Sequence, residues 1–130
     1  MVSYFSVEWK NERANKNSSA ILIVDGTRRK ITYGELSKRG DVLFQQDGPL
    51  QACDSGKFFS NLTEIMEQWG DQVDFSVSLS DDCWWKIKIR EKAGRMYRIK
   101  GTTTYPPYGD QIAKDLEALC KNAGIHIDRV

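Results

Sequence analysis

The alternation of apolar and polar side chains constrains the fold of this chain most strongly. Successive side chains of a strand point to opposite faces, so a two-residue period marks a half-buried strand. This period runs through residues 4–10, where Phe5, Val7 and Trp9 alternate with polar neighbours. Residues 20–24 are apolar at every position, which is typical of a strand covered on both faces. We therefore expect a sheet in which residues 20–24 form a central strand.

Turn dipeptides divide the remaining strands into hairpins. Asp25-Gly26 directly follows the central segment, and this dipeptide is typical of a two-residue type I′ turn, in which glycine supplies a positive φ. Ala93-Gly94 interrupts a second pair of alternating segments in the same way. The other expected strands lie at residues 27–33, 73–80, 84–92, 95–100 and 125–128.

Two helices are indicated by apolar residues that recur every three or four positions, which places them on one helix face. The first stripe spans residues 58–69 and ends at Gly70, and the second spans residues 112–123 and ends at Gly124. The stretch before the first helix carries weaker signals. There we expect a short helical turn at residues 34–40, a brief strand or hydrophobic plug at residues 42–44, and turns at residues 47–49 and 54–56.

The order of these elements predicts the fold class. The chain has 130 residues, a length that suits one domain, so residues 1–130 are expected to form a single unit. Strands followed by a helix, twice over, predict an α+β fold. Its mostly antiparallel sheet would be built from two hairpin-containing halves, with two main amphipathic helices packed on it. The halves at residues 3–69 and 73–124 are weakly similar, and either a duplication or independent origins would account for this.

Residues for the common catalytic chemistries are scarce. The chain holds one histidine, His126, and three cysteines, Cys53, Cys83 and Cys120, in none of the spacings of a zinc or Cys–His site. We therefore expect a protein that is not an enzyme, with no catalytic residues, no metal and no cofactor. An enzyme with an unrecognised thiol or carboxylate site is the alternative. The aspartates that would serve such a site are Asp71, Asp74, Asp81 and Asp82.

The cysteines and the N-terminal residues also predict the compartment. An odd number of widely spaced cysteines favours reduced thiols over a disulfide framework. Residues 1–20 lack the basic and apolar regions of a signal peptide. The longest purely apolar run, residues 20–24, is far shorter than the roughly 18 residues that a membrane-spanning helix needs. These features predict a cytoplasmic protein without a membrane partner.

Charge is distributed unevenly along the chain. Lys and Arg number 19 against 18 Asp and Glu, a balance that names no partner. Residues 84–101, however, hold seven basic residues and one acid, whereas the rest of the chain holds 12 basic and 17 acidic residues. Strand alternation puts the basic side chains, including Lys92, on one face of the second hairpin and Trp85 on the other. The candidate binding residues are Trp84, Lys86, Lys88, Arg90, Arg98 and Lys100.

Two interpretations of the basic face remain open. Lys and Arg could solvate the sheet and prevent edge-to-edge aggregation. Alternatively, they could bind phosphates or an acidic protein, with Trp84 or Tyr97 stacking on an unpaired base. The near-neutral chain lacks the motifs of known nucleic-acid-binding modules, so we expect a protein partner first and a nucleic acid second. The sequence does not indicate an oligomeric state.

The second hairpin also carries a resemblance. Residues 84–89, Arg98-Ile99-Lys100-Gly101, Tyr105-Pro106 and the last helix resemble short, mostly uncharacterised domains of Gram-positive bacteria, their phages and mobile elements. The similarity covers residues 84–122 and includes no catalytic residue. It implies a small accessory protein, such as an anti-defence or immunity-type inhibitor. We therefore expect an interaction protein that occludes a partner, for example a nucleic-acid-handling enzyme; the alternative is a nucleic-acid-binding module.

Overall fold

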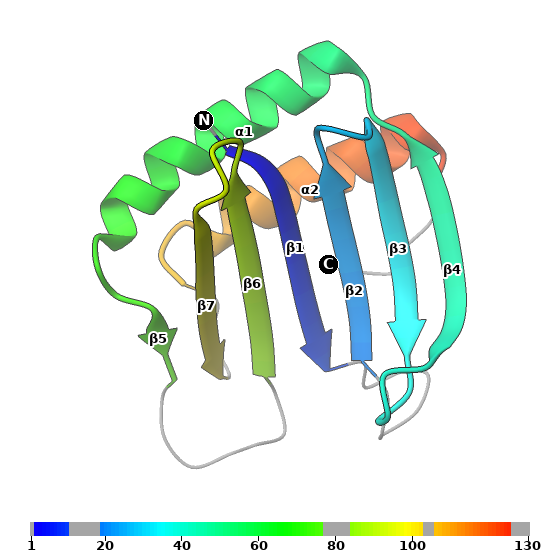
Figure 1. The fold of residues 1–130 in the computed structure, drawn as a ribbon, viewed down its shortest axis with the longest axis horizontal. Coiled ribbons are helices and arrows are strands. Elements are labelled where there is room, and N and C mark those ends of the chain that lie inside the picture. Colours follow the sequence, from blue (N-terminus) through cyan, green and yellow to red (C-terminus); the bar gives the residue numbers. More distant parts are fainter. Residues whose placement is uncertain (1, 11–18, 77–83, 103–105, 126–130) are drawn as a thin grey trace.

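The computed structural model describes residues 2–10, 19–76, 84–102 and 106–125. These residues form strands that lie side by side and two helices that pack on them (Figure 1). In chain order the elements are β1 (Val2–Lys10), β2 (Ser19–Asp25), β3 (Lys30–Leu36), β4 (Val42–Pro49), α1 (Ala52–Trp69), β5 (Asp74–Phe75), β6 (Trp84–Glu91), β7 (Met96–Thr102) and α2 (Gly109–Ala123).

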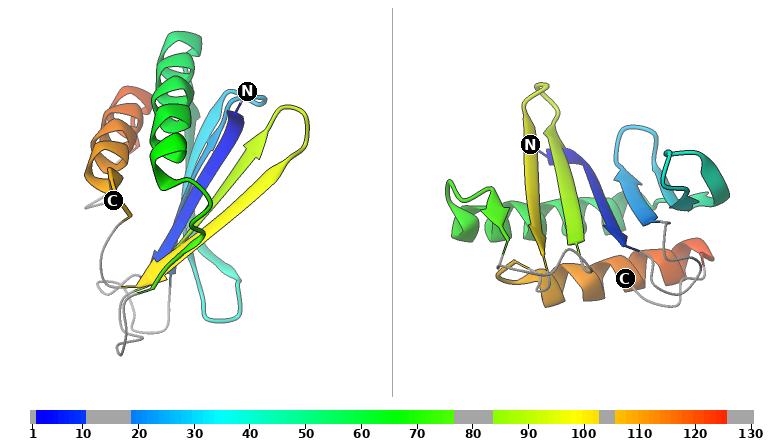
Figure 2. Two further views of the ribbon diagram at one scale, coloured as in Figure 1. Left: turned by 90° about the vertical axis from the view of Figure 1, so that its left-hand side faces the viewer. Right: turned by 90° about the horizontal axis from the view of Figure 1, so that it is seen from below.

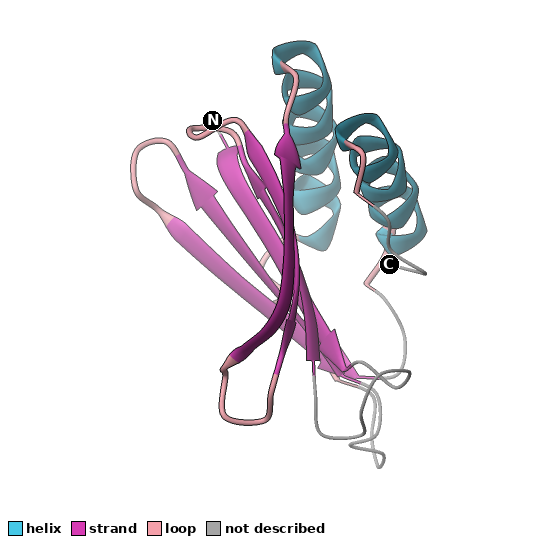
Figure 3. Cartoon of the chain, turned by 90° about the vertical axis from the view of Figure 1, so that its right-hand side faces the viewer, coloured by secondary structure: helices cyan, strands magenta, loops and turns pink. Residues whose placement is uncertain are grey.

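The strands join one sheet in the order β4-β3-β2-β1-β6-β7-β5. Neighbouring strands are antiparallel except for β5, which pairs with β7 in parallel. Both helices cover the same face of the sheet (Figure 2), and Figure 3 shows the opposite face without a helix. We call this helix-free side the open face. The expected α+β fold, with a mostly antiparallel sheet and two helices, is confirmed, and so is the central position of β2.

The core lies between the sheet and the helices, where the predicted apolar faces of the strands and of the helices pack together. Phe5 of β1, Leu22 of β2 and Ile89 of β6 are completely buried, and each is flanked in sequence by residues of the open face. The ring of Phe5 contacts that of Phe58 in α1, with centroids 5.4 Å apart. The helix residues buried in this core include Phe58, Leu62, Ile65 and Trp69 of α1 and Ile112, Leu116 and Leu119 of α2.

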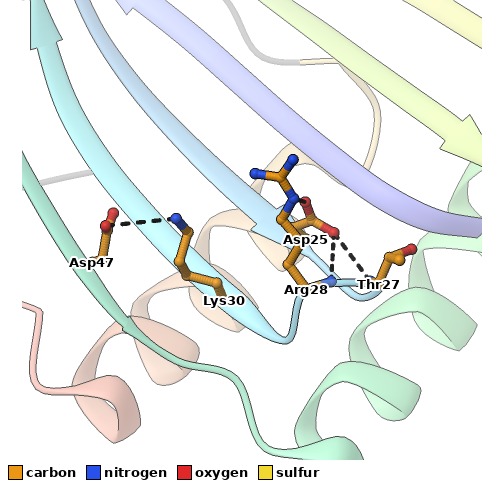
Figure 4. Close-up of polar contacts among 5 residues, drawn as sticks. All are labelled: Asp25, Thr27, Arg28, Lys30 and Asp47. Carbon is orange, nitrogen blue, oxygen red and sulfur yellow. Dashed lines mark hydrogen bonds and ion pairs between the residues drawn. The ribbon is translucent and has the colours of Figure 1, made fainter.

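The first hairpin turn differs from the prediction. The loop between β2 and β3 has four residues, not two, and Gly26 does not adopt a positive φ. Instead, the Asp25 carboxylate accepts hydrogen bonds from the backbone N–H groups of Thr27 and Arg28, both at 3.0 Å (Figure 4). The positive φ, 52°, belongs to Arg29. An Asx-type turn therefore replaces the type I′ turn, because the aspartate side chain supplies the acceptor that closes the loop.

A different constraint requires glycine at position 26. A Cβ atom there would lie 2.8 Å from the ring of Phe59 and 2.9 Å from the carbonyl oxygen of Ser3. Gly26 thus allows the loop to approach α1 closely and to donate a hydrogen bond to the Ser3 carbonyl, at 2.8 Å. The sequence marked this glycine correctly, but its role is close packing and not backbone conformation.

The predictions for residues 34–56 are largely wrong. Residues 34–36 continue strand β3, because they pair with both β2 and β4, and a turn forms only over residues 37–40, where the Gly40 N–H donates to the Ser37 carbonyl at 2.9 Å. Residues 42–44 form a strand, as one of the two alternatives expected, and this strand continues through residues 47–49, where we expected a turn. Residues 54–56 lie in the first turns of α1. In each case strand pairing or extension of the helix outweighs the local preference of glycine or aspartate for a turn.

The remaining predictions can be compared only in part. Helix α2 and the hairpin of β6 and β7 are confirmed, with Gly94 at a φ of 102° in the turn. Lys92 lies in this turn and so does not extend the strand as expected. The predicted strand at residues 73–80 contains β5, while residues 77–80 lie outside the described part. Of residues 125–128, only the buried Ile125 is described.

Candidate binding face

The structure places the predicted binding residues together on the open face. Along β6, the side chains of Trp85, Ile87 and Ile89 are buried in the core, and the residues between them point to the opposite side. Strand β7 repeats this pattern, with Ile99 buried and its neighbours outside. The side chains that emerge on the open face are the exposed Lys86, Lys88, Arg98 and Lys100 and the half-buried Trp84 and Arg90. We call these six side chains of β6 and β7 the basic band.

Like charges lie directly opposite one another in the basic band. The register of β6 and β7 pairs Lys86 with Lys100 and Lys88 with Arg98. Directly opposed like charges destabilise an antiparallel pair by several tenths of a kcal/mol, up to roughly 1 kcal/mol. The hairpin therefore forms in spite of two repulsive contacts, which an anion bound between the strands would relieve.

Each directly opposed pair forms a row across the two strands. In the Lys86–Lys100 row, neighbouring groups compensate the positive charge. Lys100 forms an ion pair of 3.9 Å with Asp74 of β5. Its partner Lys86 lies opposite Glu8 of β1 in the register, and its ammonium group stands 5.2 Å from the centre of the Trp84 ring. Carboxylates thus flank this row on both sides of the hairpin, and they reduce its local positive potential.

The Lys88–Arg98 row has no such compensation. On β1 its neighbour is the neutral Ser6, which is 7 % exposed. Neither Lys88 nor Arg98 forms an ion pair with any residue that the structure describes. Two exposed cations in adjacent strands, without contact to any carboxylate that the structure describes, make this row the strongest candidate for contact with an anionic ligand.

Arg90 extends the uncompensated row along β6. Its guanidinium carbon lies 4.8 Å from the centre of the Tyr4 ring, and Tyr4 is its direct partner on β1. Such cation–π stacking holds the guanidinium plane against the sheet while its edge stays available for a carboxylate or phosphate. Sequence reasoning missed Tyr4 in this role; only the pairing of β1 with β6 brings the two residues together.

The other half of the open face carries apolar side chains and ion-paired carboxylates. Strand β2 places Ile21 and Ile23 there, both half-buried, on the far side of β1 from the basic band. Beyond them, Lys30 contacts Asp47 at 3.6 Å, and Arg28 contacts Asp25 at 4.0 Å (Figure 4). Hydrogen bonds from Thr32 and Gln45, together with the Lys30 charge, lower the pKa of Asp47. The basic band is thus bordered by an apolar strip and then by carboxylates.

Tyr97 does not belong to the basic band, so its stacking on a ligand beside Trp84 is excluded. It pairs with Ile89 on β6 and packs against the core on the helix side. Its hydroxyl donates a 2.7 Å hydrogen bond to Glu91, and this bond, together with burial, raises the pKa of Tyr97. Arg95 lies over the same ring at 5.0 Å. Tyr97 therefore stabilises the tip of the hairpin.

The two described cysteines differ in their surroundings. Cys53 is exposed at the start of α1, whereas Cys120 is a buried residue of α2. Burial, reinforced by the negative charge of Glu117, raises the pKa of the Cys120 thiol to about 11. Cys120 is therefore a neutral core residue and no nucleophile at physiological pH. The described residues include no group of three or more His, Cys, Asp and Glu side chains that could hold a metal ion.

The raised pKa of Cys120 predicts a pH dependence. Below pH 9.0, the ordinary thiol value, both folded and unfolded chains keep the proton, so the contribution to stability is complete. Between pH 9.0 and about 11 only the unfolded chain loses it, and the free energy of unfolding should fall. Urea unfolding of wild type and Cys120→Val across this range measures the effect, since only the wild type should show this component. Parallel pH profiles would contradict the assignment.

No enclosed site of ligand size accompanies the basic band in the described part of the chain. A cavity of about 30 Å³ lies between α2 and the sheet, lined by apolar side chains including Phe5, Trp9 and Leu116. This volume is small for an organic ligand, and its walls offer no polar partner. None of the described helices is both long and apolar enough to cross a bilayer.

In comparisons with known proteins, the sequence matches no family model and none of the curated proteins.

Proposed function

We propose that this protein is a non-enzymatic interaction protein whose open face binds an acidic surface of a partner protein. In its sharpest form it is an inhibitor that occludes a nucleic-acid-handling enzyme. The observation that carries the proposal is the Lys88–Arg98 row, in which two exposed cations oppose each other without a carboxylate contact among the described residues. A partner carboxylate between them would convert a repulsive contact into two attractive ones.

The composition of the whole open face supports a protein partner over a nucleic acid. Ile21 and Ile23 lie across β1 from the basic band, and an apolar strip near complementary charge is typical of protein interfaces. Asp25 and Asp47, near the strip on the side away from the basic band, are paired with Arg28 and Lys30. These pairs carry no net charge, so they do not extend the basic band for a phosphate backbone that crosses the sheet. A partner with both carboxylates and apolar side chains matches this arrangement.

One observation favours a nucleic acid as the second candidate. Trp84 is half-buried at the end of the basic band, and the Lys86 ammonium lies over its ring. Indole rings beside cations are platforms for unpaired bases, each worth about 1–3 kcal/mol. Titration with single-stranded oligonucleotides at ~50 mM salt tests this candidate, because phosphate contacts are strongest at low salt. Absence of binding there would remove it.

Charge reversal on the open face tests the proposed function. The tagged wild type and the Lys88→Glu, Arg98→Glu variant would be used to capture proteins from a bacterial lysate at ~150 mM salt. The matched control is Lys57→Glu, Lys114→Glu, which makes the same charge change on exposed helix residues of the opposite side. We expect a partner captured by wild type and control to be reduced at least ~10-fold with the open-face variant, since buried charge contacts are worth 2–5 kcal/mol.

The captured partner then provides the functional readout. Its own activity should fall when wild type is added and should recover when the open-face variant replaces it. A partner that binds the open-face variant as well as it binds the wild type would refute the placement of the site. Circular dichroism and thermal unfolding of all three proteins confirm that the comparison is made between folded chains.

A further inference from the structure

The outer edge of β4 is the most apolar exposed segment that the structure describes. β4 is the last strand of the sheet, and among the described strands it pairs with β3 alone. Three consecutive residues at its start are large, apolar and exposed, namely Val42 at 60 %, Leu43 at 57 % and Phe44 at 44 %. Edge strands of soluble proteins are usually protected by a lysine, a proline, an inward charge or a β-bulge. These three positions carry no such side chain, and the edge is interrupted only by the register shift that leaves Leu43 without a partner on β3.

We propose that β4 is a self-association edge, on which β4 of a second copy of this chain pairs in antiparallel orientation around Leu43 and Phe44. A strand edge accepts an extended backbone, so the occupant of this surface is another strand. Charge complementarity identifies that strand as β4 itself. Asp47 lies three residues after Phe44, and the exposed Lys38 and Arg39 precede Val42 in the β3–β4 turn.

Antiparallel pairing brings these opposite charges together twice. When the apolar centres of the two strands overlap, Asp47 of each copy lies beside the turn of Lys38 and Arg39 of the other. The interface then has Val42, Leu43 and Phe44 in its middle. At each end, Asp47, which also contacts Lys30 of its own chain at 3.6 Å, faces the cations of the other copy. A strand without this charge pattern would match the apolar centre but not its ends.

The symmetry of the contact explains why this association closes. When β4 pairs with β4, each copy uses the same edge, so the like-with-like contact forms a two-fold dimer. Its axis is perpendicular to the sheet, so both open faces point the same way. The dimer would thus present two basic bands on one side.

Sedimentation velocity and light scattering of the full chain, from ~5 to ~500 µM, test the proposal. We expect a reversible monomer–dimer equilibrium, because an interface of one strand pair falls in the class of small, transient interfaces. Leu43→Lys should shift the midpoint of this equilibrium at least ~10-fold towards monomer, since it places two lysines at the centre of the interface. Lys57→Glu on α1 is the control and should leave the midpoint unchanged.

A charge swap distinguishes pairing between two β4 strands from other contacts. Arg39→Asp and Asp47→Arg should each weaken the dimer, and the double variant should restore it, because the ion pairs are re-formed with reversed polarity. A monomeric wild type at the highest concentration, a dimer insensitive to Leu43→Lys, growth into larger assemblies, or failure of the double variant to recover would each overturn the proposal. None of these results depends on the open-face partner.

Discussion

Replacing Gly101 with alanine is expected to lower the free energy of unfolding by about 3 kcal/mol, because it overpacks the core. A Cβ atom at this position of β7 would clash with Cζ2 of Trp85 and would lie 2.6 Å from its Cε2. The indole cannot retreat easily, since Trp85 is 4 % exposed and packs against Phe75, with ring centroids 6.2 Å apart. Chemical denaturation of the two proteins measures the difference.

Gly56→Ala is the matched control for this substitution. Gly56 lies in α1, and a Cβ atom there meets no other atom within 4 Å. The same chemical change should therefore raise the free energy of unfolding, by about 1 kcal/mol, because alanine favours the helix. Trp85→Phe should in addition cost less in the Gly101→Ala background than in the wild type, since it vacates the space that the new methyl group needs. Additive effects of these two substitutions would show that the predicted clash is absent.

Lys88→Glu is expected to abolish partner binding and at the same time to stabilise the protein. It changes the Lys88–Arg98 contact from repulsive to attractive, which is worth up to about 1 kcal/mol across an antiparallel pair. A variant that is more stable than wild type yet inactive would show that the repulsion is maintained for binding. Urea unfolding measures the stability, and capture of the partner measures binding.

Salt dependence provides an independent test of the same contact. Added salt screens exposed charges, with a Debye length of roughly 10 Å at 0.1 M and about 3 Å at 1 M. The stability advantage of Lys88→Glu over wild type should therefore shrink as salt is raised. Lys57→Glu, on the helix side, should show no comparable advantage at low salt. If Lys88→Glu is less stable than wild type at low salt, the proposed repulsion does not exist.

The parts of the fold that could be predicted are those where one period extends over many residues. The stripes around Leu62 and Leu116 and the alternation around Ile87 each repeat several times, so single exceptions do not obscure them. Burial of one face is a large, cumulative effect, and it makes such patterns dependable. The separation of Trp84 from Trp85 follows from the same period, and the structure confirms it.

The errors lie where contacts distant in sequence override local signals. Gly34 was expected in a helical turn, but its backbone is paired on both sides by β2 and β4. Gly48 was expected in a turn, but it is a strand residue that lies against the end of α2, where a Cβ atom would be 2.6 Å from the Ala123 carbonyl oxygen. Glycine and aspartate are ambiguous in sequence, because they permit turns and also permit close packing.

By itself, the sequence determined that the basic residues of the second hairpin share one face, because strand alternation is a property of the backbone. Only the tertiary structure decided which of these cations are compensated. Asp74 comes beside Lys100 through β5, and Glu8 lies opposite Lys86 through β1. Lys88 lies between the neutral Ser6 and Arg98, and neither of these two cations has an ion pair with a described residue. Electrostatic potential depends on distances between strands, and strand order, which no local pattern encodes, sets those distances.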